Sequence, residues 1–226
     1  MQKLAAPAEV SESVQDYTKA IWSLGRGRVP VSTSALADRL TVSPASASAM
    51  VKRLEAMGLA TRKPYHGVEL THSGKRVAME VIRHHRLVEL YLAEALGMPW
   101  DRVHKEAEVL EHAISPELSE LIAQKLGNPT RDPHGDPIPT AAGEIDEPPA
   151  RPLAALEPGD RGVFVRVSDS DPEMLRYLSR RGISPGDAFE VVEKQPFDGP
   201  ISVRFATDVH VLGGALTTAM QTEGLA

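Results

Sequence analysis

The sequence predicts an α+β multidomain protein, and three observations support this fold class. Apolar residues recur at three- and four-residue steps through most of the first 127 positions, which is typical of amphipathic helices. A proline-rich stretch, GNPTRDPHGDPIPTAAGEIDEPPARP, interrupts that pattern. Short runs that alternate Val, Phe or Ile with polar residues then follow, as in strands. We expect domains at residues 1–73, 74–140 and 153–226, with a linker at 141–152.

The first part is predicted to contain three helices and a hairpin. Apolar residues repeat with a helical period from Ser13 to Leu24, and Ser32–Ser34 offer caps for a second, short helix. Ser43 is a suitable N-cap and Pro44 a suitable first residue for a third helix, which Gly58 ends. LATRKPYHGVELT then reads as two strands around a turn. Two short helices followed by a hairpin indicate a winged helix-turn-helix.

Charge is distributed unevenly along a chain whose net charge is -6. Between Ser43 and Val88 there are eight Lys or Arg and three acidic residues. Between Trp100 and Asp160 there are five Lys or Arg and thirteen acidic residues. Because local rather than total charge governs contact with phosphates, the first third suits DNA and the middle suits cations.

The third predicted helix begins with small and polar residues, which let a helix lie deep in a major groove. Cations farther along this helix and at the hairpin tip are placed to contact the DNA backbone. The alternative is a small helical domain with a solvated basic face. The predicted DNA-binding residues are Ser43, Ala45, Ser46, Ser48, Ala49, Lys52, Arg53, Arg62, Lys63 and Tyr65.

The middle part is predicted to be almost entirely helical, because SGKRVAMEVIRHHRLVELYLAEALG, PWDRVHKEAEVLEHAIS and SPELSELIAQKLG each have a helical period. A segment of about fifty residues rarely builds an adequate core alone. We therefore expect this part to pack against a second copy of itself and form a homodimer.

The middle part also holds a candidate metal site. His104, Glu108, Glu111 and His112 fall on one face of the predicted second helix, and His85 and Glu89 lie four residues apart on the first. Carboxylates and imidazoles without sulfur suit Mn(II), Fe(II), Co(II) or Zn(II). An ordinary solvated helix face is the alternative.

Several classes of protein are disfavoured. The sequence has no Cys, which excludes disulfides and thiolate chemistry and fits a reducing compartment. A metal-dependent hydrolase is the enzymatic alternative, but the sequence contains no HExxH, Gly-rich phosphate loop or GxSxG turn. Because these catalytic motifs are missing, we expect that the protein is not an enzyme. We see no secretion signal and no membrane span, so we expect a soluble cytoplasmic protein.

The third part is predicted to be a small β-barrel of about seventy residues. Its strand-like runs are RGVFVRVSD, DAFEVVEK, PISVRFAT and HVLGGALTTAM. DPEMLRYLSRRGISPG between them is expected to form one short helix and a turn.

The whole pattern resembles the diphtheria toxin repressor family of metal-dependent transcriptional regulators. It is most similar to the manganese-responsive members that keep a third, SH3-like domain. The resemblance implies a metal-activated repressor of metal-uptake genes that binds a pseudo-palindromic site in double-stranded DNA as a homodimer. An Fe(II)-responsive regulator of the same family is the alternative. The matching stretches are VQDYTKAIW, SPASASAMVKRLEAMGL, RHHRLVELYL, VHKEAEVLEHAIS, RDPHGDPIP and DPEMLRYLSRRGISPG.

The resemblance also implies two metal sites. Iron-responsive members use Met, Cys, Glu and His at the primary site, and hard carboxylates at the first two positions favour Mn(II) over Fe(II). A metal there would fix the DNA-binding domain against the dimer domain. Lys19 stands where some manganese regulators have a Glu, and a protonated Lys cannot bind metal. The implied primary ligands are Asp16, Glu108, Glu111 and His112. The implied second-site ligands are His85, Glu89 and His104, with Asp171 and Glu173, or Asp169, from the SH3-like domain.

Overall fold

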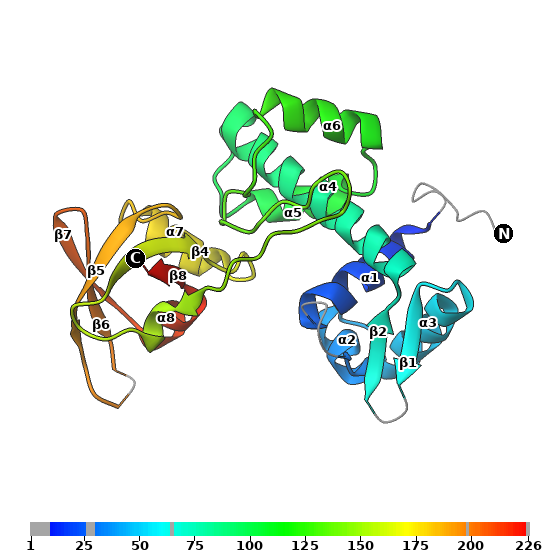
Figure 1. The fold of residues 1–226 in the computed structure, drawn as a ribbon, viewed down its shortest axis with the longest axis horizontal. Coiled ribbons are helices and arrows are strands. Elements are labelled where there is room, and N and C mark those ends of the chain that lie inside the picture. The colour runs from blue at the N-terminus through cyan, green and yellow to red at the C-terminus, as the bar shows by residue number, and fades with distance from the viewer. Residues whose placement is uncertain (1–9, 26–29, 64–65, 198, 225–226) are drawn as a thin grey trace. The chain divides into compact units, whose positions relative to one another are not determined.

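The computed structural model describes residues 10–25, 30–63, 66–197 and 199–224, and the chain forms two compact units (Figure 1). Unit 1 consists of the residues up to His85 together with Glu108–Gln124 and Pro139–Ile145. Unit 2 consists of Arg86–Ala107, Lys125–Ile138 and the residues from Asp146 onward. Within the described ranges, no helix has the length and apolar character that crossing a membrane requires.

Unit 1 begins with the three predicted helices, α1 (Glu12–Gly25), α2 (Thr33–Arg39) and α3 (Pro44–Ala56). Both predicted serine caps are present. Ser32 Oγ accepts a hydrogen bond from the N–H of Ala35, and Ser43 Oγ accepts one from the N–H of Ser46, each at 3.1 Å. These bonds satisfy helix donors that no carbonyl of the same helix can reach. Gly58 follows α3 with a φ of 71°, the left-handed conformation that commonly ends a helix.

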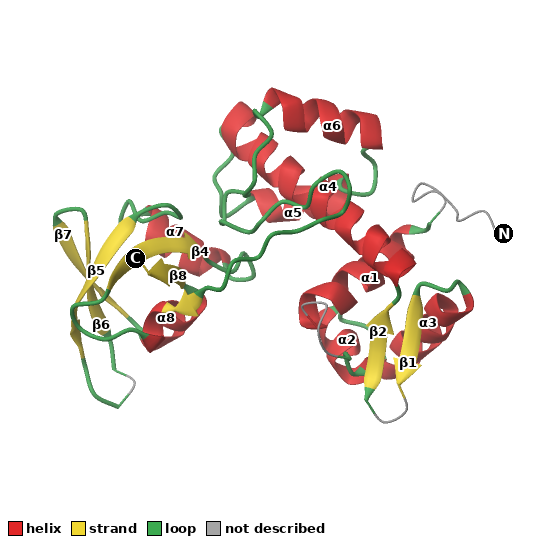
Figure 2. Ribbon diagram, viewed as in Figure 1, coloured by secondary structure: helices red, strands yellow, loops and turns green. Residues whose placement is uncertain are grey.

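The predicted hairpin consists of β1 (Ala60–Lys63) and β2 (Gly67–Leu70), which pair in antiparallel fashion (Figure 2). Val31 and Val68 exchange two backbone hydrogen bonds of 2.9 Å, which tie the hairpin to the segment before α2. Gly67 has a φ of 114°, and a Cβ at this position would lie 2.3 Å from the carbonyl oxygen of Val31. A residue without a side chain is therefore required where the hairpin meets that segment.

The helical middle of the chain forms α4 (His72–Leu96), α5 (Val103–Leu110) and α6 (Pro116–Lys125). We predicted that His104, Glu108, Glu111 and His112 share one helix face, and this prediction is wrong. α5 ends at Leu110, and Glu111 and His112 lie in the turn that follows it. The next helix begins soon afterwards, because Ser115 caps α6 and Pro116 disfavours helical backbone at the residue before it.

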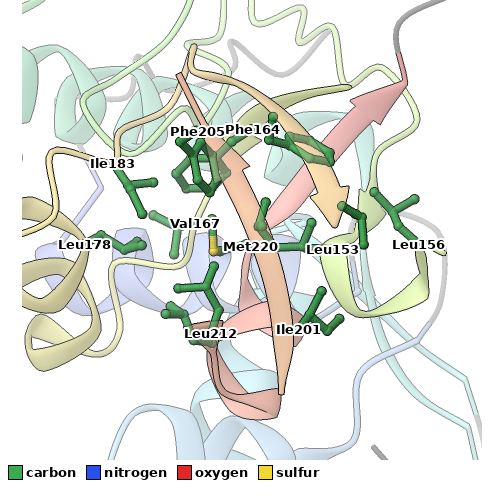
Figure 3. Close-up of a cluster of buried hydrophobic side chains, with 14 of the residues drawn as sticks. Leu153, Leu156, Phe164, Val167, Leu178, Ile183, Ile201, Phe205, Leu212 and Met220 are labelled. Carbon is green, nitrogen blue, oxygen red and sulfur yellow. The ribbon is translucent and has the colours of Figure 1, made fainter. Parts of the chain in front are cut away.

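The C-terminal part of unit 2 is a six-stranded antiparallel sheet with the order β3-β8-β4-β5-β6-β7. Helices α7 (Pro172–Ser179) and α8 (Gly214–Ala219) accompany the sheet (Figure 1). A short 3-10 helix, η2, covers Leu153–Ala155. Its core is built around Phe164, Leu178, Leu212 and Met220, which are all inaccessible to solvent (Figure 3). The strands are β3 (Arg151–Pro152), β4 (Arg161–Arg166), β5 (Ala188–Lys194), β6 (Ile201–Phe205), β7 (Asp208–Leu212) and β8 (Gln221–Gly224).

One part of the strand prediction for this unit is wrong. HVLGGALTTAM reads as a strand-like run, but only its beginning belongs to β7, and Gly214–Ala219 forms α8. Leu216 and Met220 are both buried and lie four residues apart, so a helical turn brings both into the core. A single pair of apolar residues is too short a pattern to reveal this period from the sequence.

Candidate metal centres

The first cluster of metal-binding side chains lies in unit 1, where two elements meet. α1 carries Asp16, and the turn after α5 carries Glu111 and His112. Potential donor atoms of these three residues lie within 4.8 Å of one another. His112 Nε2 lies 3.0 Å from Asp16 Oδ1, and His112 Nδ1 lies 2.5 Å from Gln15 Oε1. The imidazole is therefore held by α1 through both of its nitrogens.

A second group of donors in unit 1 shares Glu111 with the first. His85 from α4 and Glu108 from α5 bring potential donor atoms within 4.8 Å of Glu111. His85 Nδ1 is hydrogen-bonded to Glu111 Oε2. Lys19 from α1 points its ammonium at the same group and lies 3.1 Å from His85 Nδ1 and 3.1 Å from Glu108 Oε1. It also lies 2.9 and 2.7 Å from the two carboxylate oxygens of Glu111.

The surroundings tune these groups differently. Burial raises the pKa of Glu111. The hydrogen bond from His85 and the charge of Lys19 lower it by more than burial raises it, so the pKa falls below the usual value. Burial raises the pKa of Asp16, and the neighbouring Glu111 adds to this rise while His112 opposes it. Burial also lowers the pKa of His84, whose Nδ1 lies 3.2 Å from the backbone carbonyl of Glu111. Glu111 is thus the carboxylate that stays ionised, and Asp16 is the one that is more readily protonated.

The first cluster is open to solvent on one side. Asp16, Lys19, Glu108 and His112 line a groove in unit 1. The side chains of Asp16 and Glu108 are 43% and 50% exposed, whereas that of Glu111 is 1% exposed. An ion can therefore reach the buried carboxylate through its two exposed neighbours.

The second cluster lies in unit 2 and is built on Glu89 of α4, His104 of α5 and Asp169 from the loop before α7. His104 Nδ1 lies 3.2 Å from Glu89 Oε1 and 3.0 Å from Asp169 Oδ2. Burial lowers the pKa of His104, but the hydrogen bonds with Asp169 and Glu89 outweigh burial and raise it to about 10. His85, which we also predicted for this site, precedes Glu89 by one turn of α4 and belongs to unit 1.

The structure brings Asp169 rather than the two other predicted acids to His104. Asp171 is the N-cap of α7, and its Oδ1 accepts hydrogen bonds from the N–H groups of Glu173 and Met174 at 2.9 and 3.3 Å. The side chain of Glu173 is 88% exposed and lies 3.7 Å from Arg176. Capping and exposure keep these two carboxylates out of the groups of close donors found among the described residues.

Sequence reasoning missed two residues at the second cluster. Asp132 and His134 come from the proline-rich stretch, and both bring potential donor atoms within 4.8 Å of Glu89. His134 Nδ1 lies 3.6 Å from Glu89 Oε2, and its Nε2 lies 2.9 Å from the carbonyl oxygen of Trp100. Burial and the neighbouring carboxylates raise the pKa of Asp132 well above its ordinary value. The available signal was DPHGD, three polar side chains within five residues of a segment that otherwise reads as a linker.

Most of the predicted DNA-binding residues are exposed on α3 and the hairpin. Ala47, Val51 and Leu54 of α3 are buried in the core of unit 1. Tyr65 lies outside the described residues. Of the other predicted residues, Ser48 is half-buried, and the exposed ones are Ser43, Ala45, Ser46, Ala49, Lys52, Arg53, Arg62 and Lys63.

Comparison with known proteins identifies the family. Residues 9–68 match "Iron dependent repressor, N-terminal DNA binding domain", and residues 71–140 match "Iron dependent repressor, metal binding and dimerisation domain". Residues 151–216 match the FeoA domain. A solved structure described as a manganese-dependent transcriptional repressor in complex with manganese is 44% identical and covers 94% of this chain and 100% of its own, with a TM-score of 0.88. The chain belongs to the diphtheria toxin repressor family.

Two further members of the diphtheria toxin repressor family show the extent of the likeness. The iron-dependent repressor IdeR of Mycobacterium tuberculosis is 35% identical over 131 residues, which are 58% of this chain and 57% of that protein. The chain thus spans just over half the length of this relative. The diphtheria toxin repressor of Corynebacterium efficiens is 29% identical over 197 residues, or 83% of this chain and 86% of that protein. Family membership confirms the predicted fold class and the prediction of a transcriptional regulator rather than a hydrolase.

Proposed function

We propose that this protein is a Mn(II)-activated repressor that binds a pseudo-palindromic DNA operator as a homodimer and controls metal-uptake genes. The observation that carries the proposal is the first cluster. Asp16 comes from the DNA-binding domain, whereas Glu111 and His112 come from the metal-binding and dimerisation domain. These three residues would hold a cation between the two domains.

The donor set fits Mn(II). The first cluster offers carboxylate oxygens from Asp16 and Glu111 and an imidazole nitrogen from His112. Hard oxygen donors with imidazole suit Mn(II), whereas sulfur donors would shift preference towards softer ions. The similar structure described in complex with manganese supports the same choice. Fe(II) also binds to carboxylate and imidazole donors, so activation by Fe(II) has to be distinguished from activation by Mn(II) experimentally.

Each residue of the cluster has a distinct part in the switch. A bound divalent ion supplies positive charge where the carboxylates converge. Glu111 is buried and ionised, so it fixes the position of that charge in the dimerisation domain. Asp16 is partly exposed on α1, and its Oδ1 lies 3.0 Å from His112 Nε2. Neutralising the repulsion between Asp16 and Glu111 stabilises α1 against the dimerisation domain.

The DNA-binding part of the proposal rests on α3. This helix presents small residues at its exposed N-terminal end and the cations Lys52 and Arg53 farther along. Restraining α1 would also restrain α3, because the two helices share one core that contains Val14, Ile21 and Leu54. In a homodimer, two fixed α3 helices match half-sites spaced by about one helical turn. Metal and DNA then strengthen each other's binding to an equal degree.

Exposed apolar side chains support the homodimer. Leu118 and Leu121 lie three residues apart on α6 and are 44% and 56% exposed. Exposed apolar residues on neighbouring turns of a helix are typical of an interaction surface, and the matched domain is a dimerisation domain. We infer that these residues meet their counterparts in a second copy.

The test is selection of genomic DNA fragments by the purified full chain. Parallel selections contain a chelator, Mn(II) or anaerobic Fe(II), all at one salt concentration because salt alone changes DNA affinity. We expect a shared palindrome to be enriched with Mn(II) and not with chelator. His112→Ala should abolish this enrichment, whereas His210→Ala on β7 should retain it, because His210 lies in none of the close donor groups of the described residues.

The other outcomes are equally informative. Enrichment at lower Fe(II) than Mn(II) concentrations would keep the mechanism and overturn the choice of metal. Enrichment that is the same with chelator and with both metals would refute the switch. Enrichment that survives His112→Ala would show that the first cluster does not control DNA binding.

A further inference from the structure

The Lys19 ammonium occupies a position that has the surroundings of a bound cation. His85, Glu108 and Glu111 form one of the groups of close donors in unit 1. Lys19 Nζ lies within 3.1 Å of a donor atom of each of these three residues and contacts both carboxylate oxygens of Glu111. Its side chain is 15% exposed, so the charge is largely removed from water. The group therefore already contains a positive charge supplied by the chain.

The charges of the cluster add to the same picture. Asp16, Glu108 and Glu111 contribute three negative charges, and Lys19 contributes one positive charge. With the imidazoles of His85 and His112 neutral, these residues together carry a net negative charge that one divalent ion balances. A second divalent ion would have to enter beside an ammonium that bears three donors but offers no lone pair. Like charges at this distance in a partly buried site repel strongly.

We propose that Lys19 is a resident cation that takes the place of one metal ion. The first cluster then binds a single divalent ion, at Asp16, Glu111 and His112, and the position among His85, Glu108 and Glu111 is filled by the ammonium. The inference rests on the metal site of the proposed function and specifies its stoichiometry. An isolated buried ion pair that serves only stability is the competing explanation, and it makes no prediction about the number of ions.

A consequence follows for the shape of the metal response. Lys19 belongs to α1, and it contacts α4 through His85 and the α5 region through Glu108 and Glu111. Part of the link between the DNA-binding and dimerisation domains is therefore made by the chain itself. One ion per cluster completes the link, so this cluster responds to metal without cooperation between two neighbouring ions.

The test counts Mn(II) ions bound to the purified full chain by isothermal titration and by electron paramagnetic resonance. The reference protein, called the parent, is the full chain with His104→Ala, and every other variant also carries this substitution. It weakens metal binding at the second cluster to the same extent in all of them. The parent should bind one Mn(II) in the first cluster. Lys19→Met removes the charge at nearly constant length and should raise the count to two, with the spectrum of a magnetically coupled pair. Lys19→Arg keeps the charge and should bind one, as should Lys75→Met, which changes an exposed lysine of α4.

Each result decides the proposal. Two coupled ions in the parent, or one ion in a folded Lys19→Met variant, would overturn it. Circular dichroism checks folding, and Lys19→Gln replaces Lys19→Met if that variant does not fold. His112→Ala in the parent should remove the single ion, and retention of that ion would also overturn the assignment. A parallel Co(II) titration separates the two proposals: a rise from one to two with Co(II) but no Mn(II) binding would support the role of Lys19 and refute the manganese assignment.

Discussion

Raising the pH should destabilise unit 2 of the metal-free protein, and His104 makes the size of this effect testable. The contacts of His104 with Asp169 and Glu89 raise its pKa to about 10, against 6.5 for an ordinary histidine. A raised pKa means that the folded state holds the proton more tightly than the unfolded chain does. The stabilisation is therefore complete below about pH 6.5 and is lost as the pH rises towards 10.

The magnitude follows from the pKa. A rise from 6.5 to about 10 corresponds to at most about 5 kcal/mol at roughly 1.4 kcal/mol per pKa unit. Two carboxylates share this effect, and a hydrogen bond to a charged group contributes about 1.5–3 kcal/mol. Asp169→Asn removes one of the two charges, so it should lower the unfolding free energy near neutral pH by about 2 kcal/mol. It should also flatten the dependence on pH.

The assay is urea unfolding between pH 6.5 and 9.5 in the presence of a chelator. Trp22→Phe leaves Trp100 as the remaining tryptophan, and Trp100 stacks on His134 in unit 2 with ring centroids 5.8 Å apart. Its fluorescence therefore reports on the unit that contains His104. Asp208→Asn, at an exposed position of β7, is the matched control. An unfolding free energy that does not fall with pH, or an equally steep fall in Asp169→Asn, would refute the reasoning.

Three other perturbations test the packing and the DNA-binding surface. Phe164→Ala should lower the unfolding free energy by about 3–5 kcal/mol, whereas Phe197→Ala, at a side chain 99% exposed, should change it by less than about 0.5 kcal/mol. Gly67→Ala should cost more thermal stability than Gly58→Ala, because only the Cβ at position 67 would meet a backbone atom, and equal losses would contradict this. Arg53→Ala should reduce the salt dependence of operator affinity by about 1.8 log units per log unit of salt, from two lost phosphate contacts per dimer, as measured by fluorescence anisotropy. Arg180→Ala in unit 2 should leave that slope unchanged.

Local chemistry explains which parts of the fold were predictable. Ser32 and Ser43 cap helices through their own side chains, and Pro44 and Gly58 restrict the backbone at the two ends of α3. Such signals act within a few residues and can be read directly from the sequence. The end of α5 was harder, because the competing cap that begins α6 lies after the acidic and histidine residues that seemed to continue the helix.

The clusters themselves depend on tertiary contacts. The residues of VHKEAEVLEHAIS look like one site in the sequence, yet His104 contacts groups of unit 2 while Glu111 and His112 contact groups of unit 1. The sequence indicated that Lys19 is not a metal ligand. Only the fold shows its ammonium among the donors. Asp169 likewise emerges over Asp171 because a helix cap claims the latter.

The proline-rich stretch shows how a segment without regular structure can be part of a site. Proline removes backbone donors, so fewer groups need partners when such a segment is buried. Backbone carbonyls of this segment have hydrogen-bond partners. The N–H of Val167 donates to the carbonyl of His134 at 3.0 Å, and Arg131 donates to the carbonyl of Gly135 at 2.7 Å. Gly135 has a φ of 86°, and a Cβ there would lie 1.9 Å from the carbonyl oxygen of Val165. Glycine thus permits the close approach to β4 that fixes His134 beside Glu89. The proline-rich stretch is therefore part of the second cluster and not only a flexible linker.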